Sequence, residues 1–388
     1  MDKEFRGELA AVHDWACDQI AQTAGRLEGS EQFPHVTDDG RWRTWPADVY
    51  AGWEGDSWSH GNWTCGFWVG LLWLALSRTH DHRFEEWARY FGDLVAPRQR
   101  DENTHDIGFI FYPSFALGHL VTGDEKLREP AVRAARTLTT RFNPRGGYLQ
   151  AWGPLDHPLA RRSTAIDTMM NLPLLWWASR ITNDPEFAEI ARAHAVTSAR
   201  YYLRPDGSTY HIYTFDPDTG TGMEGGTYQG ANPDSTWSRG VTWGIYGWTL
   251  AYREHRDPAF LEAAEKAADY FVGALPADLV PSWDFADDDP SAPKDSSATA
   301  ICANAFLELG EVHPDALRRA YYRSMAEAML ASLCRDYLGR DEEGEEGILL
   351  HSAYSVPHDD GVDSSVMWGE WFFLRAVSHL TVDPVPIP

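Results

Sequence analysis

Residues 165–181 read AIDTMMNLPLLWWASRI, and Asp184-Pro185-Glu186-Phe187 follows two residues later. The first segment is apolar nearly all round, which is typical of a helix that is buried on most sides. In the second, Asp followed by Pro supplies an N-cap and a favourable first helical residue. A one-sided helix is expected to begin there. Together the two segments predict a helical hairpin with an inner and an outer helix.

This pairing recurs along the chain. Inner-type segments lie at residues 66–78, 108–121, 165–181, 240–253, 298–309 and 366–380. Outer-type helices are predicted to open at Asp81, Asp124, Asp184, Asp257 and, in a shifted copy, His313; an amphipathic helix at about Glu4–Leu27 makes six. An open stack of hairpins would expose its terminal inner helices, whereas a closed ring covers all of them. We therefore predict an all-α fold, an (α/α)6 barrel forming one domain over residues 1–388, with room for a short hairpin in 210–230.

The net charge and the composition of the chain indicate which partners and which location to expect. A net charge of −25 would repel nucleic acid and anionic membranes, so neither is expected as a partner. No apolar run approaches the length of a membrane-spanning helix, and residues 1–6 do not begin a signal peptide. The four cysteines show no CxxC spacing, which argues against a disulfide framework or a zinc site. These features predict a cytoplasmic protein.

Two residue types are unusual in number. The 33 basic residues include only four lysines, a bias that indicates either a salt-adapted acidic surface or a GC-rich genome. The 18 tryptophans either pack in the core or lie against sugar C–H surfaces. Many of them stand beside Gly, Asn, Asp and Arg rather than on aliphatic stripes, which favours a sugar site.

Carboxylates mark the predicted mouth of the barrel, where the chain enters the inner helices. Five of the six inner helices have one, namely Asp106, Asp167, Asp234, Asp295 and Asp363. Asp295 and Asp363 each precede Ser-Ser and are interpreted as N-caps. Asp167 lies within an apolar run, where burial would raise its pKa and suit it to general acid catalysis, and Asp106 is the natural second carboxylate. Two acids across a barrel mouth are typical of a glycoside hydrolase.

Three motifs then resemble one family. They are His105-Asp106-Ile107-Gly108-Phe109, Ile166-Asp167-Thr168-Met169-Met170-Asn171, and Trp237-Ser238-Arg239-Gly240 continuing to Trp243-Gly244-Ile245-Tyr246-Gly247. With Gly361-Val362-Asp363 and Trp368-Gly369-Glu370, they closely resemble the unsaturated glucuronyl hydrolases of glycoside hydrolase family 88. The resemblance covers essentially the whole chain and implies the same (α/α)6 barrel.

The resemblance also implies roles for individual residues. Asp167 would be the general acid/base and Asp106 its supporting carboxylate. Trp63 would be the stacking aromatic, with Trp58 as the alternative. The residues expected to contact substrate are Trp63, His105, His211, Gln229, Trp237, Arg239 and Trp243. The substrate would be an unsaturated oligosaccharide, with no metal, nucleotide or redox cofactor, and the oligomeric state stays open.

The implied substrate is a vinyl ether at the non-reducing end of a lyase product. Protonation of C4 places positive charge on C5, water adds there, and the resulting hemiketal opens to release the aglycone. His211 and Arg239 could donate hydrogen bonds to the sugar carboxylate, although Arg239 could instead form a buried ion pair with Asp234 or Asp167.

Three other functions stay open. They are an unsaturated rhamnogalacturonyl hydrolase, an inverting glycosidase that acts on a saturated sugar with the same two acids, and a barrel that only binds oligosaccharide. The sequence around Arg239 favours the glucuronyl type over the first. A carboxylate embedded in an apolar helix argues against the last.

One segment bears on sulfated substrates. Relatives that prefer sulfated fragments resemble one another in a Ser-x-x-Ser-x-Lys motif shortly before Gly-Val-Asp. Here the segment reads Ser352-Ala353-Tyr354-Ser355-Val356-Pro357, so proline replaces the lysine, and His358, Asp359 and Asp360 follow. Proline has neither charge nor N–H, and the two acids would repel a sulfate. The sequence therefore predicts a preference for unsulfated disaccharides.

Overall fold

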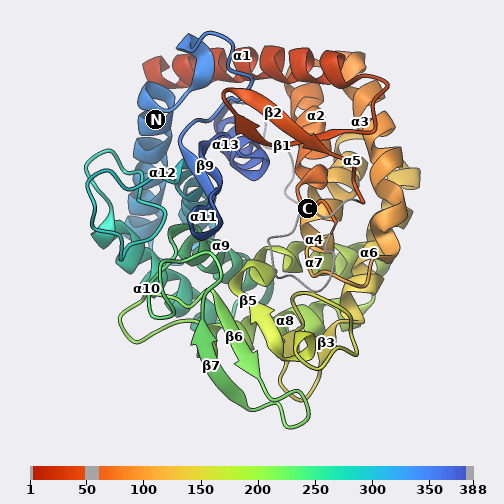
Figure 1. Cartoon of the computed structure of the whole chain (residues 1–388), viewed down its shortest axis with the longest axis vertical. Coiled ribbons are helices and arrows are strands. Elements are labelled where there is room, and N and C mark those ends of the chain that lie inside the picture. The colour runs from red at the N-terminus through yellow and green to blue at the C-terminus, as the bar shows by residue number, and fades with distance from the viewer. Residues whose placement is uncertain (1–2, 49–60, 382–388) are drawn as a thin grey trace.

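The computed structural model of the chain describes residues 3–48 and 61–381. Within these, inner and outer helices alternate around a ring (Figure 1). The inner helices are α2 (Cys65–Thr79), α4 with α5 (Ile107–Phe111 and Leu117–Thr122), α7 (Leu172–Thr182), α9 (Ser238–His255), α11 (Ser296–Val312) and α13 (Met367–Thr381). The outer helices are α1 (Lys3–Leu27), α3 (His82–Val95), α6 (Glu125–Thr139), α8 (Pro185–Tyr201), α10 (Pro258–Ala274) and α12 (Ala316–Asp336).

The first and last helices close the ring. On α1, the Nδ1 atom of His13 lies 2.9 Å from the Thr381 hydroxyl oxygen at the end of α13. The neighbouring Asp14 accepts a hydrogen bond of 2.7 Å from Arg78 of α2. Because both ends of the chain's helical series meet, no inner helix is left uncovered, and the predicted (α/α)6 barrel is confirmed.

The outer helices begin where the repeat predicts. Asp81, Asp124, Asp184 and Asp257 each accept a hydrogen bond from the backbone N–H two residues further on, as N-caps do. In the shifted fifth copy the cap is Asp315, which accepts from the N–H groups of Leu317 and Arg318. The cap, Asp315, therefore lies two positions after His313, where the sequence predicts this helix to open.

Two inner helices differ from the sequence prediction. The second is interrupted by a π-helical turn, Tyr112–Ala116, which contains Pro113 and therefore lacks one backbone donor. The third does not begin at residue 165. Residues Ser163–Ala165 form strand β5, Ile166–Met170 form a 3₁₀ turn, and the α-helix begins only at Leu172, followed by Pro173. Asp167 therefore lies in a turn before the helix.

Short antiparallel strands occupy the connections between helices. They pair as β1 (Phe33–Asp38) with β2 (Arg41–Trp45), β3 (Phe142–Asn143) with β4 (Tyr148–Leu149), β5 with β6 (Ile212–Phe215) and β7 (Gly222–Gly226), and β8 (Ser352–Ser355) with β9 (Asp360–Ser364). The hairpin expected within 210–230 is confirmed as β6 and β7.

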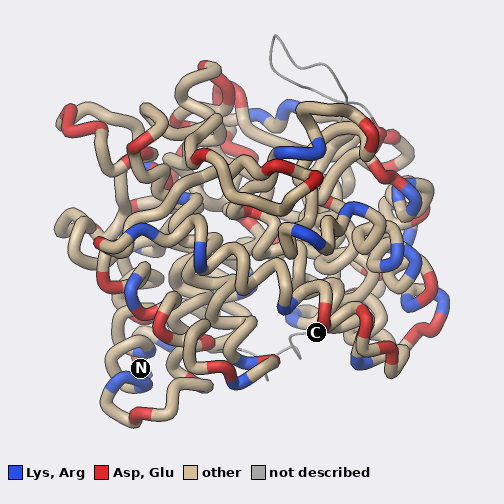
Figure 2. The backbone as a smooth tube through the Cα atoms, turned by 90° about the horizontal axis from the view of Figure 1, so that it is seen from below, with Lys and Arg blue, Asp and Glu red and all other residues tan. Residues whose placement is uncertain are grey.

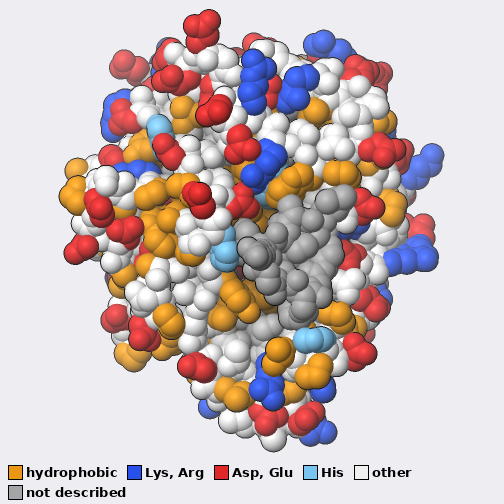
Figure 3. Space-filling view, viewed as in Figure 1, with side chains coloured by type: hydrophobic (Ala, Val, Ile, Leu, Met, Phe, Trp, Pro, Cys, Tyr) orange, Lys and Arg blue, Asp and Glu red, His pale blue; other side chains and the backbone are white. Residues whose placement is uncertain are grey.

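The acidic residues are spread over the molecule. Acidic and basic residues are both scattered along the backbone in Figure 2, and acidic side chains surround the face seen in Figure 3. Arginines pair with them on the surface: Arg136, for example, contacts both Asp184 and Glu186. Among residues 3–48 and 61–381, no helix combines the length and apolar character that crossing a bilayer requires.

Candidate active site

The pairing of β5 with β6 brings Asp167 and His211 together. Ala165 pairs with Ile212, and the N–H of Ile166 donates to the carbonyl of His211 over 2.8 Å. The side chains of Asp167 and His211 therefore face each other, with His211 Nε2 3.3 Å from Asp167 Oδ2. His211 Nδ1 accepts the backbone N–H groups of Tyr228 and Gln229, so the ring proton is assigned to Nε2, which faces the carboxylate.

Asp106 joins the same cluster through His105. Asp106 Oδ1 lies 3.3 Å from His105 Nε2, and its Oδ2 accepts a hydrogen bond of 3.0 Å from Thr104. The other ring nitrogen of His105 lies 2.7 Å from the hydroxyl of Thr168, the residue after Asp167. His105 therefore connects the two segments that carry the carboxylates.

The two carboxyl groups have opposite pKa shifts. Burial, and then the negative charge of Asp167, raise the pKa of Asp106 to about 7. Burial alone would raise the pKa of Asp167 too, but the nearby His211 and the more distant Arg239 outweigh it and lower this pKa. The expectation that the apolar surroundings of Asp167 raise its pKa is therefore wrong. Below about pH 7, the pair in the free protein therefore holds its proton on Asp106.

Aromatic side chains surround the cluster. Trp63, half-buried, stacks on Trp368 with ring centroids 4.8 Å apart and donates to the Tyr354 hydroxyl over 3.3 Å. Trp237 lies 4.5 Å from His211, centroid to centroid. Trp243 is buried, and among the described residues its Nε1 has no hydrogen-bond partner. Trp58, the alternative stacking residue, lies outside the described residues.

Arg239 is fixed by the protein itself. Its Nη1 lies 2.6 Å from Asp295 Oδ2, and its Nη atoms also donate to the carbonyls of Ala353 and Tyr354. The guanidinium carbon lies 4.3 Å from the ring centroid of Trp237. Arg239 therefore does form a buried ion pair, as the alternative prediction held, but its partner is Asp295 and not Asp234 or Asp167.

Both acids interpreted as N-caps have other roles, and those interpretations are wrong. Asp295 makes no capping hydrogen bond, because its carboxylate is bonded to Arg239 and to the hydroxyl of Ser297. Asp363 lies within β9 with a positive φ and is bonded to His351, so it does not precede α13 directly. Gln229 Nε2 donates to the Tyr354 carbonyl over 2.8 Å, the same carbonyl that Arg239 binds, and its contact with substrate stays a prediction.

Trp152 also lies at the site, although the sequence did not predict it there. Its ring lies 5.4 Å from that of His105 and 6.4 Å from that of His211, edge to face, between the two histidines that face the carboxylates. A short bridge between Trp152 and Thr104 holds it there. The sequence feature that could have indicated Trp152 is its position in the segment before the third inner helix, which also contains Asp167.

Within the described ranges, no three or more His, Cys, Asp or Glu side chains are grouped to hold a metal ion. The chemistry available is that of a buried carboxyl pair, two histidines and flat aromatic surfaces. An (α/α)6 barrel that holds two buried acids, with pKa values shifted in opposite directions and tryptophans beside them, is typical of a glycoside hydrolase.

Comparison with known proteins identifies the family. The model of Glycosyl Hydrolase Family 88 matches residues 41–361, and the chain belongs to this family. It is 36% identical over 372 residues to the unsaturated glucuronyl hydrolase of Bacillus sp. (strain GL1), covering 94% of this chain and 95% of that protein. The crystal structure of an unsaturated glucuronyl hydrolase from Bacillus sp. GL1 superposes with a TM-score of 0.87, covering 95% and 96% of the two chains at 34% identity.

A second relative has a different name. The unsaturated chondroitin disaccharide hydrolase of Streptococcus pyogenes serotype M1 is 36% identical over 281 residues, which cover 72% of this chain and 70% of that protein.

Proposed function

We propose that this glycoside hydrolase removes 4,5-unsaturated glucuronic acid from the non-reducing end of lyase-generated oligosaccharides. The observation that carries the proposal is the buried pair of Asp106 and Asp167, each facing a histidine, in a chain of family 88. One relative that covers 94% of this chain is named an unsaturated glucuronyl hydrolase, and another that covers 72% is named an unsaturated chondroitin disaccharide hydrolase. A vinyl ether needs a proton donor and an activated water, and a carboxyl pair with one proton supplies both.

The pair begins the reaction with one proton, on Asp106. The negative charge of an arriving uronate raises the pKa of Asp167, which favours transfer of that proton to Asp167. Asp167 then donates it to C4 of the sugar, and positive charge develops at C5. The Asp167 carboxylate accepts a proton from the water that adds to C5, so the pair again holds one proton. One water is consumed, and opening of the hemiketal releases the aglycone.

The donors for the sugar carboxylate follow from which N–H groups are free. Arg239 already uses both Nη atoms within the protein, so we assign it to holding Tyr354 and Trp237 in place. Trp243 Nε1 has no hydrogen bond within the described residues and is the donor we assign to the sugar carboxylate, whereas His211 Nε2 faces Asp167 at 3.3 Å. We assign Trp63 and Trp152, both half-buried beside the cluster, to contact the sugar rings.

The test is the ultraviolet absorbance of the 4,5-unsaturated sugar. Lyase-digested hyaluronan or chondroitin is mixed with the protein, and loss of the chromophore is followed together with release of reducing sugar. Loss of absorbance supports the proposal. Absorbance that stays constant while reducing sugar appears would favour a glycosidase acting on saturated sugars. Activity on unsaturated rhamnogalacturonan disaccharides and none on glucuronyl ones would favour the rhamnogalacturonyl type.

A further inference from the structure

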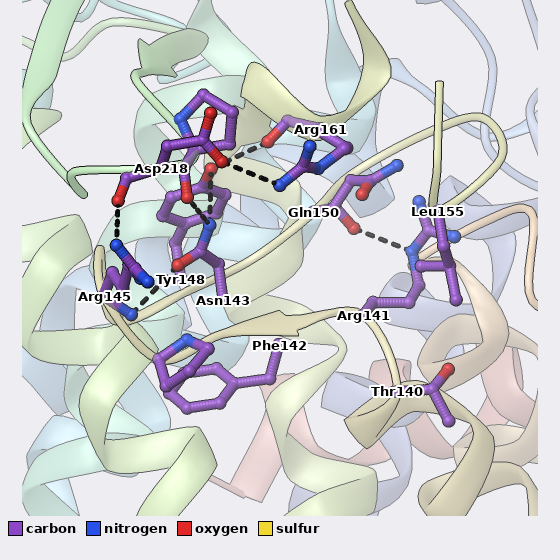
Figure 4. Close-up of a pocket in the computed structure, with 12 residues that line it drawn as sticks. Thr140, Arg141, Phe142, Asn143, Arg145, Tyr148, Gln150, Leu155, Arg161 and Asp218 are labelled. Carbon is purple, nitrogen blue, oxygen red and sulfur yellow. Dashed lines mark hydrogen bonds and ion pairs between the residues drawn. The ribbon is translucent and has the colours of Figure 1, made fainter. Parts of the chain in front are cut away.

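Arg141 is a buried arginine directly behind the wall of the site. It follows α6, and only 2% of its surface is exposed. Its guanidinium donates to three backbone carbonyls: Nε to Gln150 over 2.8 Å, Nη2 to Gly153 over 3.2 Å, and Nη1 to Glu102. Figure 4 shows the guanidinium beside Gln150, at the edge of a cavity of about 320 Å³.

No carboxylate pairs with this charge among the residues that the structure describes. The other buried arginines of the region differ, because Arg98 pairs with Asp101 at 2.7 Å and Arg239 with Asp295 at 2.6 Å. Burial lowers the pKa of Arg141 to about 10, so it still carries its charge at neutral pH. A buried cation without a carboxylate partner is costly, and carbonyl dipoles offset only part of that cost. The remaining compensation comes from negative charges that make no ion pair with Arg141, namely those of Asp101, then Asp106, and then Glu102.

The carbonyls that Arg141 binds belong to the two segments that form this wall. The segment before Asp106 and the segment 150–153 pair with each other. The His105 N–H donates to the Ala151 carbonyl over 2.8 Å, and the Gly153 N–H donates to the Asn103 carbonyl over 2.9 Å. Arg141 bonds to carbonyls on both segments, so its fork fixes the spacing between Asp106 on one and Trp152 on the other.

We propose that Arg141 is a positioning residue for the hydrolytic reaction, which holds the Asp106 segment against the Trp152 segment and supplies a fixed positive charge behind the Asp106 carboxyl. The proposal rests on the proposed function, since it concerns the same carboxyl pair. The Arg141 side chain therefore contributes to the reaction in two ways, through its shape and through its charge. The planar fork sets geometry, and the charge sets how readily Asp106 loses its proton.

The other groups that face Asp106 fix the sign of the charge effect. Its polar and charged neighbours are Thr104 and His105 on its own segment, Arg98 after α3, Asp167 before α7, Tyr354 on β8 and Arg141. Asp167 raises the pKa of Asp106, whereas Arg98 and Arg141 lower it. Removing the charge of Arg141 therefore favours the protonated form of Asp106 up to a higher pH.

The experiment compares three variants by the pH dependence of kcat/KM, followed through chromophore loss. Arg141→Gln removes both charge and fork, and Arg141→Lys keeps the charge without the fork. Arg145→Gln is the matched control, because Arg145 is an exposed arginine lining the same cavity. For Arg141→Gln we expect the pH at which kcat/KM begins to fall on the alkaline side to rise by about half a pH unit or more. For Arg141→Lys we expect an unmoved limb and a plateau about tenfold lower, because one ammonium cannot hold three carbonyls in place. Arg145→Gln should match the wild type in both.

An Arg141→Gln profile that superimposes on the wild type would overturn the charge effect. A wild-type plateau in Arg141→Lys would overturn the positioning effect, and this second variant decides the matter if Arg141→Gln does not fold. A limb that moves equally in Arg145→Gln would show that general surface charge, not Arg141, is responsible. If the wild-type protein does not act on unsaturated substrates, the proposed function fails instead, before any variant is compared.

Discussion

His211 Nε2 lies 3.3 Å from Oδ2 of Asp167, so the imidazole ring and the carboxylate face each other. Two backbone N–H groups occupy the other ring nitrogen, so the proton on Nε2 faces the carboxylate. This relationship keeps Asp167 ionised in the free protein and leaves Asp106 as the protonated member of the pair.

Replacing Asp167 by Asn should abolish turnover and leave the fold intact. An amide of the same shape cannot deliver a proton to C4, so we expect kcat to fall on the order of 10³-fold. Asp106→Asn should be similarly severe, because it removes the group that holds the proton. Asp234→Asn is the control, since Asp234 is exposed at the same mouth. Activity of Asp167→Asn within about tenfold of wild type would contradict the assignment.

Activity should decline on the alkaline side near neutrality. The reaction needs one proton on the pair, and the raised pKa of Asp106, about 7, means that this proton is lost as the pH rises through that value. We therefore expect kcat/KM to be level below about pH 7 and to fall tenfold per unit above it. The measurement is kcat/KM from pH 5 to 9 in buffers of constant ionic strength. A limb lying well above pH 8 would mean that another group limits the reaction.

The pair of Arg239 and Asp295 should be important for stability. Removing one partner leaves a buried charge without compensation, so Asp295→Ala should lower the free energy of unfolding by about 3–5 kcal/mol. Glu186→Ala breaks an exposed pair with Arg136 and should cost at most about 1 kcal/mol. Urea unfolding of both variants tests the contrast, and equal losses would refute it.

The acidic, lysine-poor surface should respond to salt. If its composition is a salt adaptation, screening of repulsion should raise the thermal midpoint between low salt and molar KCl. Calorimetry at both salt concentrations measures this. A midpoint that is constant or falls would leave genomic composition as the explanation.

Unsulfated disaccharides should be preferred over 6-sulfated ones. In the structure Pro357 lies in a short 3₁₀ turn, and Ser355 is bonded to the ring of His358 rather than free. Arg43 pairs with Asp360, so Asp360 repels a sulfate less than the sequence suggests. Asp359 and the missing lysine still favour the unsulfated substrate. We expect a higher kcat/KM for unsulfated than for 6-sulfated chondroitin disaccharide in one buffer, and the reverse order would mean that Arg43 or His358 receives the sulfate.

The repeat predicted the architecture because capping and helical periodicity are local properties. Asp-Pro at a helix start and apolar residues at a spacing of three and four can be read within a dozen residues. The ring followed from counting hairpins, and the motifs around Asp106, Asp167 and Arg239 identified the family. Where a local cue was ambiguous, the prediction failed: residues 163–170 form a strand and a 3₁₀ turn instead of the start of a helix.

Long-range contacts decided the rest. Which acid is protonated depends on what faces each carboxylate, and β6 brings His211 to Asp167 from 44 positions away in the sequence. Asp295 has the sequence of an N-cap, yet Arg239, 56 residues earlier, takes its carboxylate. Trp152 and Arg141 have no distinctive local pattern, and only their contacts with the Asp106 segment place them at the site. Hydrogen bonding and charge act through space, so sequence alone determined the barrel and its acids, and tertiary structure decided how those acids are charged and held.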